Sequence, residues 1–398
     1  MGSAGASPPV LVALVAAGVF FVRTAALMLG PLLVALAAAF HTSVPVMGQL
    51  AAAINLSWGV TAPLVGPISD TYGRRVVGLS GLLLMALGML GSILAWSYGA
   101  LLACRLLTGV GAAMIPPNSM ALIADHFPPD RRGTPISIVL CASFFGMVLV
   151  VPLIALLADL GGWRVPFAVM GLMIAVVWGL QWLGLPRRPR EAVPALTFLA
   201  RFRAVGQSRG IWYVWGANAC YQMAAFGLFT YLAAFLIQTH GLTAGGTAMP
   251  LAVVGTGAML GSLLGGRIAS HAQRLALAAT TLVAGGLLGG LAFAMPLPPW
   301  MTMLVGGASA LLLTSFEAIP WALTAELAGD SRATANGLLA SSNQLGAAAG
   351  ASMGGVVLAL GGFPSVGLFC LGAATAAAVV IGLLVRSIGK VHVRVAQA

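Results

Sequence analysis

Charged residues are scarce in this chain. Only 7% of its 398 residues are Asp, Glu, Lys or Arg, whereas 60% are hydrophobic, and the mean hydropathy is +1.02. A soluble globular protein carries about a quarter charged residues, so this composition excludes an ordinary water-soluble fold. Because one membrane-spanning helix takes about 20 apolar residues, the length accommodates about a dozen spans and leaves no room for a separate soluble domain.

Cysteine and metal-ligand patterns are also sparse. Cys104, Cys141, Cys220 and Cys370 each lie in a different apolar stretch, which argues against a disulfide framework. No spacing of His and Cys indicates a metal site, and no glycine-rich phosphate loop indicates ATP hydrolysis. We therefore expect no metal, no cofactor and no enzymatic activity. The net charge of +11 comes from arginines scattered among short loops, so nucleic acid is not an expected partner.

Long apolar runs dominate the sequence. They are continuously apolar and rich in Gly and Ala, whereas strands of a membrane barrel would alternate in polarity, so we predict helices. The sequence thus predicts an all-α membrane protein with twelve transmembrane helices, near 9–38, 44–69, 76–97, 99–124, 134–158, 165–186, 211–238, 247–269, 275–296, 299–325, 335–360 and 364–387.

Basic residues fall on one side of these spans. Of the 19 Lys and Arg residues, Arg164 alone lies in a loop on the opposite side, while Arg23 and Arg105 lie within spans. Cytoplasmic loops carry the excess of basic residues, so both termini are predicted to be cytoplasmic. The first apolar run has no basic leader and is too long for a signal peptide, so we expect it to be retained as a span.

An internal repeat divides the chain into halves. LVGPISDTYGRR from Leu64 aligns with LLGGRIASHAQR from Leu263, and Ala124-Asp125 aligns with Ala325-Glu326 at nearly the same offset. Parallel repeats of this kind are typical of transporters built from two similar bundles. We predict two pseudo-symmetric six-helix bundles, residues 1–186 and 211–398, joined by a cytoplasmic linker, residues 187–210.

The loop GPISDTYGRR from Gly66 resembles the signature loop of the major facilitator superfamily, which lies between the second and third helices. Arg105-Leu-Leu-Thr-Gly109 resembles the R-x-x-x-G motif of the fourth helix, and Gly162-Trp163-Arg164 with Phe167 resembles the G-W-R-x-x-F run that opens the sixth. The chain is most similar to the twelve-helix drug/proton antiporter branch, which includes sugar efflux permeases. The resemblance implies alternating access, and we expect a monomer in a bacterial inner membrane.

One feature departs from the antiporter pattern. The fifth span contains Gly146 and Pro152 but lacks the adjacent Gly-Pro pair of antiporters.

The signature loop has the composition of a latch. Gly66 and Gly73 permit close backbone approach and a tight turn, and Asp70 can pair with Arg74 or Arg75. Such a cluster would hold the cytoplasmic side closed. The alternative is that these arginines only set the topology. Because Ala269 replaces Asp70 in the second half, we expect an asymmetric latch.

Three charged residues lie well inside predicted spans, away from the span ends. Arg23, Arg105 and Glu317 each cost about 2.5–3.5 kcal/mol on insertion scales, so they are functional candidates. The resemblance implies that their helices line the central cavity. Glu317 is the candidate proton carrier, since low dielectric favours a neutral carboxyl and Arg23 would favour an ionised one. The alternatives are a fixed Arg23–Glu317 salt bridge and, for Arg105, hydrogen bonds within the first bundle.

Polar residues in predicted spans are candidates for orienting a substrate. The strongest are Asn118 in the fourth span and Asn218, Tyr221, Gln222 and Tyr231 in the seventh. Asn343 and Gln344 in the eleventh span are similar, although they could simply bond between helices.

The sequence as a whole predicts a secondary active transporter, with protons, a small-molecule substrate and the lipid bilayer as its partners. The first hypothesis is proton-coupled export of small organic molecules. The alternatives are uptake of a small organic anion by proton symport, and a membrane sensor or scaffold that has lost transport.

Overall fold

The computed structural model describes residues 8–128, 131, 133–186, 209–328 and 332–396, and every regular element within these ranges is helical. This confirms the predicted all-α class. In the same ranges, eleven helical segments are long and apolar enough to cross a membrane. They are Pro8–Ala39, Val44–Ser69, Arg74–Ile93, Tyr98–His126, Thr134–Gly161, Arg164–Gly184, Gly210–His240, Gly245–Ala269, Arg274–Ala294, Pro299–Leu327 and Thr334–Arg386.

The last of these segments contains two spans. It is 53 residues long, and its backbone is non-helical at Gly361 (φ −144°, ψ 16°) and Gly362 (φ 72°, ψ −169°). A positive φ of this kind is adopted easily only by glycine. The kink falls between the two runs that the sequence predicts here, 335–360 and 364–387, so the described chain has the twelve predicted spans.

The chain divides into two compact units. Unit 1 comprises the described residues of Met1–Ala195 and Gly241–Ala252, and unit 2 those of Leu196–His240 and Val253–Ala398. The short segment 241–252 therefore groups with unit 1, although the sequence assigns it to the second bundle. Most of the predicted linker, residues 187–208, lies outside the described residues.

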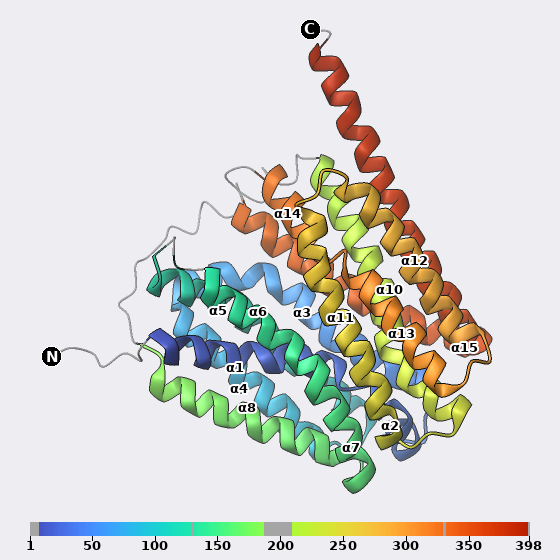
Figure 1. Ribbon diagram of the computed structural model, residues 1–398. Helices are drawn as coiled ribbons and strands as arrows, with labels where there is room; N and C mark the ends of the chain where they lie inside the picture. The colour runs from blue at the N-terminus through green and yellow to red at the C-terminus, as the bar shows by residue number, and fades with distance from the viewer. Residues whose placement is uncertain (1–7, 129–130, 132, 187–208, 329–331, 397–398) are drawn as a thin grey trace, which may run out of the picture. The chain divides into compact units, whose positions relative to one another are not determined.

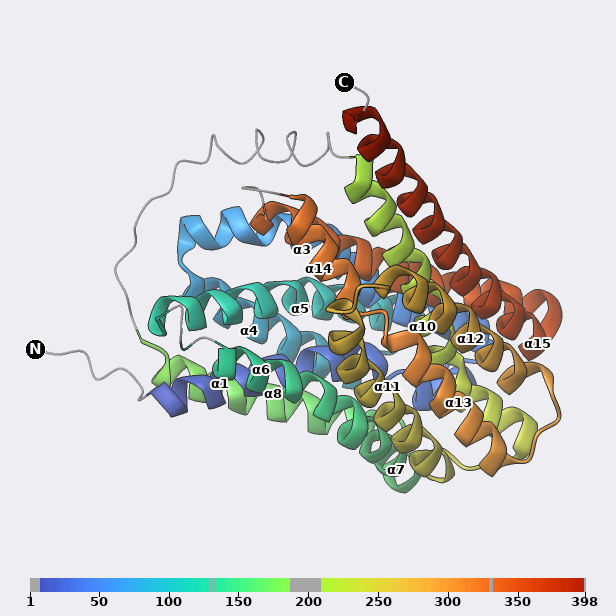
Figure 2. The same ribbon diagram turned by 45° about the horizontal axis from the view of Figure 1, so that its top comes forward.

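Unit 1 is a bundle in which α1, α4, α5, α6 and α8 run side by side (Figures 1 and 2). The closest packing is between α4 and α5, α3 and α5, α4 and α8, and α1 and α6. Its elements are α1 (Pro8–Leu27), η1 (Gly30–Leu32), α2 (Leu33–Ala39), α3 (Val44–Tyr72), α4 (Arg74–Ile93), α5 (Tyr98–His126), α6 (Gly133–Phe145), the π-helix η3 (Gly146–Val150), α7 (Val151–Gly161), α8 (Arg164–Gly184) and η4 (Gly245–Thr247).

Unit 2 is built around the packing of α10 and α12 against α15, with α13 beside α12 (Figure 1). Its elements are α10 (Arg209–His240), most of α11 (Ala248–Ala269), α12 (Arg274–Ala294), α13 (Pro299–Thr314), α14 (Ala318–Leu327) and α15 (Arg332–Ala396).

Proline accounts for the interruptions within three spans. A proline inside a helix has no N–H to donate, and its ring clashes with the carbonyl four residues earlier. Pro31 follows the end of α1 at Leu27, Pro152 follows the π-helix η3, and Pro320 follows the break between α13 and α14. The third of these interruptions places Glu317 between two helices.

Candidate functional site

The signature loop makes a tight turn between α3 and α4. Gly73 has φ 90° and donates its N–H to the Ser69 carbonyl at 2.8 Å, as expected from the sequence. The close approach predicted at Gly66 is not observed, since a Cβ there would meet no described atom within 4 Å. The side chain of Asp70 lies outside the described part of the structure.

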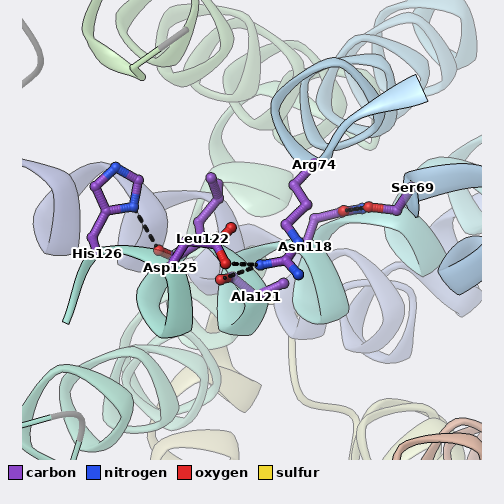
Figure 3. Close-up of polar contacts among 7 residues, drawn as sticks. All are labelled: Ser69, Arg74, Asn118, Ala121, Leu122, Asp125 and His126. Carbon is purple, nitrogen blue, oxygen red and sulfur yellow. Dashed lines mark hydrogen bonds and ion pairs between the residues drawn. The ribbon is translucent and has the colours of Figure 1, made fainter. Parts of the chain in front are cut away.

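Arg74 joins the start of α4 to the end of α5. Its guanidinium forms an ion pair with Asp125, and Nη1 also donates to the Ala121 carbonyl at 2.9 Å. Figure 3 shows this pair beside a second polar link, in which the Ser69 hydroxyl donates to Oδ1 of Asn118. Nδ2 of Asn118 in turn donates to the Met114 carbonyl at 2.6 Å.

These bonds define the surroundings of Asn118. Asn118 is buried, and both ends of its amide are used in bonds to α3 and within α5. The structure therefore shows this substrate candidate linking α3 to α5, through Ser69 near the signature loop.

Arg75 contacts α8 rather than α5. Its Nη2 and Nε donate to the carbonyls of Trp182 at 2.5 Å and Leu185 at 3.1 Å, and its guanidinium lies 5.5 Å from the centre of the Trp182 ring. The last carbonyls of a helix lack partners within the helix, and a cation there is favourable. Arg75 thus caps the C-terminal end of α8, next to the predicted linker.

Unit 2 contains a counterpart of the Arg74–Asp125 pair. Arg274, the first residue of α12, makes two bonds to the Glu326 carboxylate at 2.7 and 2.6 Å. Both pairs join the first residue of one helix to an acid near the end of the next span. The sequence repeat aligns Asp125 with Glu326, but it places Gln273 opposite Arg74 and aligns Arg274 with Arg75. We expected an asymmetric latch because Ala269 replaces Asp70 in the second half, yet each unit contains an ion pair of this kind. From the sequence, Asp125 and Glu326 fall just after the predicted spans 99–124 and 299–325, and the repeat indicates only that these two acids are equivalent.

Breaking either ion pair is expected to cost little stability. A double-mutant cycle with Arg274→Gln and Glu326→Gln should give a coupling energy of about 0.5–1 kcal/mol, because partly exposed pairs are screened by water and salt. Arg74→Gln with Asp125→Asn provides the matched cycle in unit 1. Thermal unfolding in detergent measures both, and a coupling above ~2 kcal/mol in one unit alone would contradict equivalent roles.

Arg105 is completely buried inside unit 1. Its Nη2 donates to the Ser92 hydroxyl at 2.9 Å and lies 3.3 Å from the sulfur of Met89, and its guanidinium lies 4.7 Å from the centre of the Phe167 ring. Nε and Nη1 have no hydrogen-bond partner among the described residues. These contacts join α5 to α4 and α8, which agrees with the alternative that Arg105 bonds within the first bundle.

The G-W-R-x-x-F run lies at the N-terminal start of α8 and supports this arrangement. Arg164 donates to the Ile93 carbonyl at 3.1 Å and lies 4.2 Å from the centre of the Trp163 ring. The rings of Trp163 and Phe167 are in edge contact at 6.0 Å. The motif therefore positions the aromatic ring that faces Arg105.

Glu317 lies at the break in the tenth span. The N–H groups of Phe316, Glu317 and Ile319 each donate to the carbonyl three residues earlier, instead of four, at 3.2, 3.0 and 3.0 Å. The side chain is half-buried, and its Oε2 is shielded from solvent. A carboxylate thus occupies the N-terminal end of α14, where the helix dipole favours negative charge.

An amide cluster lies beside this break. Asn218 and Gln222, one turn apart on α10, both donate to Oδ1 of Asn343 on α15, at 2.9 and 2.5 Å. The ring of Tyr221 makes an edge contact with Phe316 at 5.5 Å, next to Glu317. Asn218 and Gln222 are therefore brought together at Asn343, and Tyr221 on the same helix contacts the residue before Glu317.

The fourth α10 candidate serves a different purpose. Tyr231 is fully buried, and its hydroxyl donates to the Ala351 carbonyl at 2.6 Å. It links α10 to α15 two turns beyond the amide cluster.

Arg23 is half-buried near the end of α1. Arg23 belongs to unit 1 and Glu317 to unit 2, so their predicted pairing stays a prediction.

Comparisons with known proteins identify the family. The family model of the Major Facilitator Superfamily matches residues 15–322. An uncharacterized MFS-type transporter of Bacillus subtilis, YceJ, is 28% identical over 302 residues, 75% of each chain. The 3-(3-hydroxy-phenyl)propionate transporter of Escherichia coli is 26% identical over 306 residues, 74% of this chain and 73% of that protein.

A solved structure shares the fold. A bacterial homolog of the human lysosomal transporter Spinster, in an inward-facing and unoccupied conformation, superposes with a TM-score of 0.67 at 20% identity and covers 96% of both chains. The chain belongs to the major facilitator superfamily. It is a multi-pass membrane transporter and not an enzyme.

Proposed function

We propose that this chain takes up a small organic acid together with protons, and that Glu317 carries the proton. The observation that carries the proposal is the interruption of the tenth span at Glu317. Discontinuous helices in transporters typically hold substrate or coupling-ion sites, because their unwound backbone lines a cavity. A carboxyl group at such a break can bind a proton when it is reached from one side and release it when it is reached from the other.

Two observations favour an organic acid as the cargo. The Escherichia coli relative is named for a hydroxylated phenylpropionate. In this chain, Arg23 on α1 is a half-buried cation within a predicted span, and it is the candidate group for a substrate carboxylate. Together these observations favour uptake of an anion, the first alternative from the sequence.

Proton-coupled export of small organic molecules is the second candidate. It is favoured by the resemblance of Gly66–Arg75 and Arg105–Gly109 to the drug/proton antiporter branch. The remaining parts of the proposal are a monomer in a bacterial inner membrane, cytoplasmic termini, and two bundles, residues 1–186 and 211–398, that rock about a midplane site.

Uptake of labelled 3-(3-hydroxyphenyl)propionate into proteoliposomes separates symport from antiport. A gradient of one pH unit supplies about 1.4 kcal/mol per proton, which is enough for a tenfold accumulation of substrate when one proton moves with each molecule. We expect faster protein-dependent uptake with an acidic exterior, measured as an initial rate above protein-free vesicles, which report passive entry of the undissociated acid. Faster uptake with an acidic interior would instead show antiport and favour export.

A further inference from the structure

Two neighbouring amides on α15 have hydrogen-bonding groups that the protein does not use. Oδ1 of Asn343 accepts from both Asn218 and Gln222, which orients the amide and leaves the two N–H groups of Nδ2 with no partner among the described residues. The side chain of Gln344 makes no hydrogen bond to any described residue. Both side chains are half-buried.

These amides lie away from the exposed apolar stripe of α15. Large apolar side chains on this part of the helix are exposed at Leu345, Met353 and Val356, by 42%, 47% and 52%. At 100° per residue, Asn343 is rotated about 160° and Gln344 about 100° from Leu345. The polar groups therefore do not face the side that meets hydrocarbon, where an unbonded amide is costly.

The packing of glycines confirms the orientation of Asn343. A Cβ at Gly346 or Gly350 would lie 2.5 Å from the carbonyl oxygen of Ala219 or Met223, so this face of α15 is pressed against α10. Asn343 lies one and two turns before these glycines and shares their face.

The amides and Glu317 lie at similar distances along their helices from the point where α14 and α15 are joined in the sequence. Glu317 precedes the end of α14 by ten residues, and Asn343 follows the start of α15 by eleven, with only a short connection between the two helices. At 1.5 Å per residue both lie roughly 15 Å from that connection. A neutral hydroxyl can bind next to Glu317 without the repulsion that a second carboxylate would meet, and it can both accept from and donate to an amide.

We propose that Asn343 and Gln344 form the subsite for a hydroxyl group of the transported acid. This inference rests on the proposed function, and it deepens that function by restricting the cargo to hydroxylated acids. The carboxylate of the cargo is then bound elsewhere.

Gln344→Leu is the most direct variant, because the side chain has no bond to a described residue that its removal would break. The probes are 3-(3-hydroxyphenyl)propionate and 3-phenylpropionate, which differ by one hydroxyl. We expect wild-type protein to show a KM about tenfold lower for the hydroxylated acid, as one lost hydrogen bond implies. Gln344→Leu should reduce this ratio to about twofold or threefold and leave uptake of 3-phenylpropionate unchanged.

Asn343→Leu tests the second amide. Leucine has nearly the shape of asparagine and can neither donate to a hydroxyl nor accept from it, so the preference for the hydroxylated acid should fall again. Thermal unfolding checks that the variant is folded, because Asn218 and Gln222 lose their acceptor. Met353→Leu, on the exposed stripe, is the control and should keep the wild-type ratio.

Each outcome decides a separate point. A wild-type ratio in both Gln344→Leu and Asn343→Leu, with both variants folded, would overturn the inference while the proposed function stands. Failure of the wild-type protein to transport either acid would overturn the proposed function and the subsite together.

Discussion

Glu317→Gln is expected to lose proton-driven uptake and to retain exchange of substrate. Glutamine has nearly the shape of glutamate and can occupy the break between α13 and α14, but it cannot release a proton and become charged. The tenfold accumulation of substrate that a one-unit pH gradient can drive should therefore disappear. Counterflow, in which labelled substrate enters as unlabelled substrate leaves, needs no net proton movement and should continue. Both are measured in proteoliposomes at matched protein content.

Glu326→Gln is the matched control for this result. Glu326 lies at the other end of α14, is exposed, and is paired with Arg274. Its replacement removes an acid from the same helix without touching the break, so gradient-driven uptake should persist. If Glu317→Gln retained uptake at the wild-type rate, Glu317 would not be the proton carrier. The Arg23–Glu317 salt bridge would predict a different pattern, in which Glu317→Gln also impairs counterflow.

The spans were predictable because lipid imposes a strict rule. Each backbone polar group in hydrocarbon must be bonded within its own helix or barrel, so long apolar runs become helices. The runs 335–360 and 364–387 predict the kink at Gly361 and Gly362, since glycine permits the backbone to leave the helix there. Pro320 is the residue in the sequence that signals a break near Glu317. Which residues leave the α-helix before this proline is known only from the structure.

The directions of polar side chains were much less predictable. Asn118 and Tyr231 were substrate candidates by composition alone, yet both form bonds between helices of one unit. Helices in these bundles are apolar on nearly every face, so hydrophobic periodicity does not mark which side faces a cavity. Asn343 was more accessible to reasoning, because it shares a helix face with Gly346 and Gly350.

The glycine faces illustrate the same limit. Steps of small residues indicate close helix packing, because association in lipid depends on van der Waals contact. The sequence does not say which helix is the partner. In the structure Gly346 and Gly350 contact α10, and Gly265 contacts the carbonyl of Ser315 at the break, all within unit 2.

Gly350→Val is expected to prevent unit 2 from folding. A Cβ at position 350 would lie 2.5 Å from the carbonyl oxygen of Met223 and 2.8 Å from its Cα, so the clash is with backbone that cannot rotate away. Overpacking a core usually costs ~1–3 kcal/mol, and separation of α10 from α15 should exceed that range. The fraction of monodisperse protein extracted in detergent and its thermal unfolding measure the effect.

Gly372→Val supplies the control on the same helix. A Cβ at position 372 would meet no described atom within 4 Å, so the substitution adds a side chain in open space. Because glycine is a poor helix former, this variant should unfold at the wild-type temperature or slightly above it, with a change of about 0.5 kcal/mol. If Gly350→Val also extracted and unfolded like wild type, the close contact of α15 with α10 would be wrong. The orientation of Asn343 toward Asn218 and Gln222 would then be wrong as well, because the same helix face sets both.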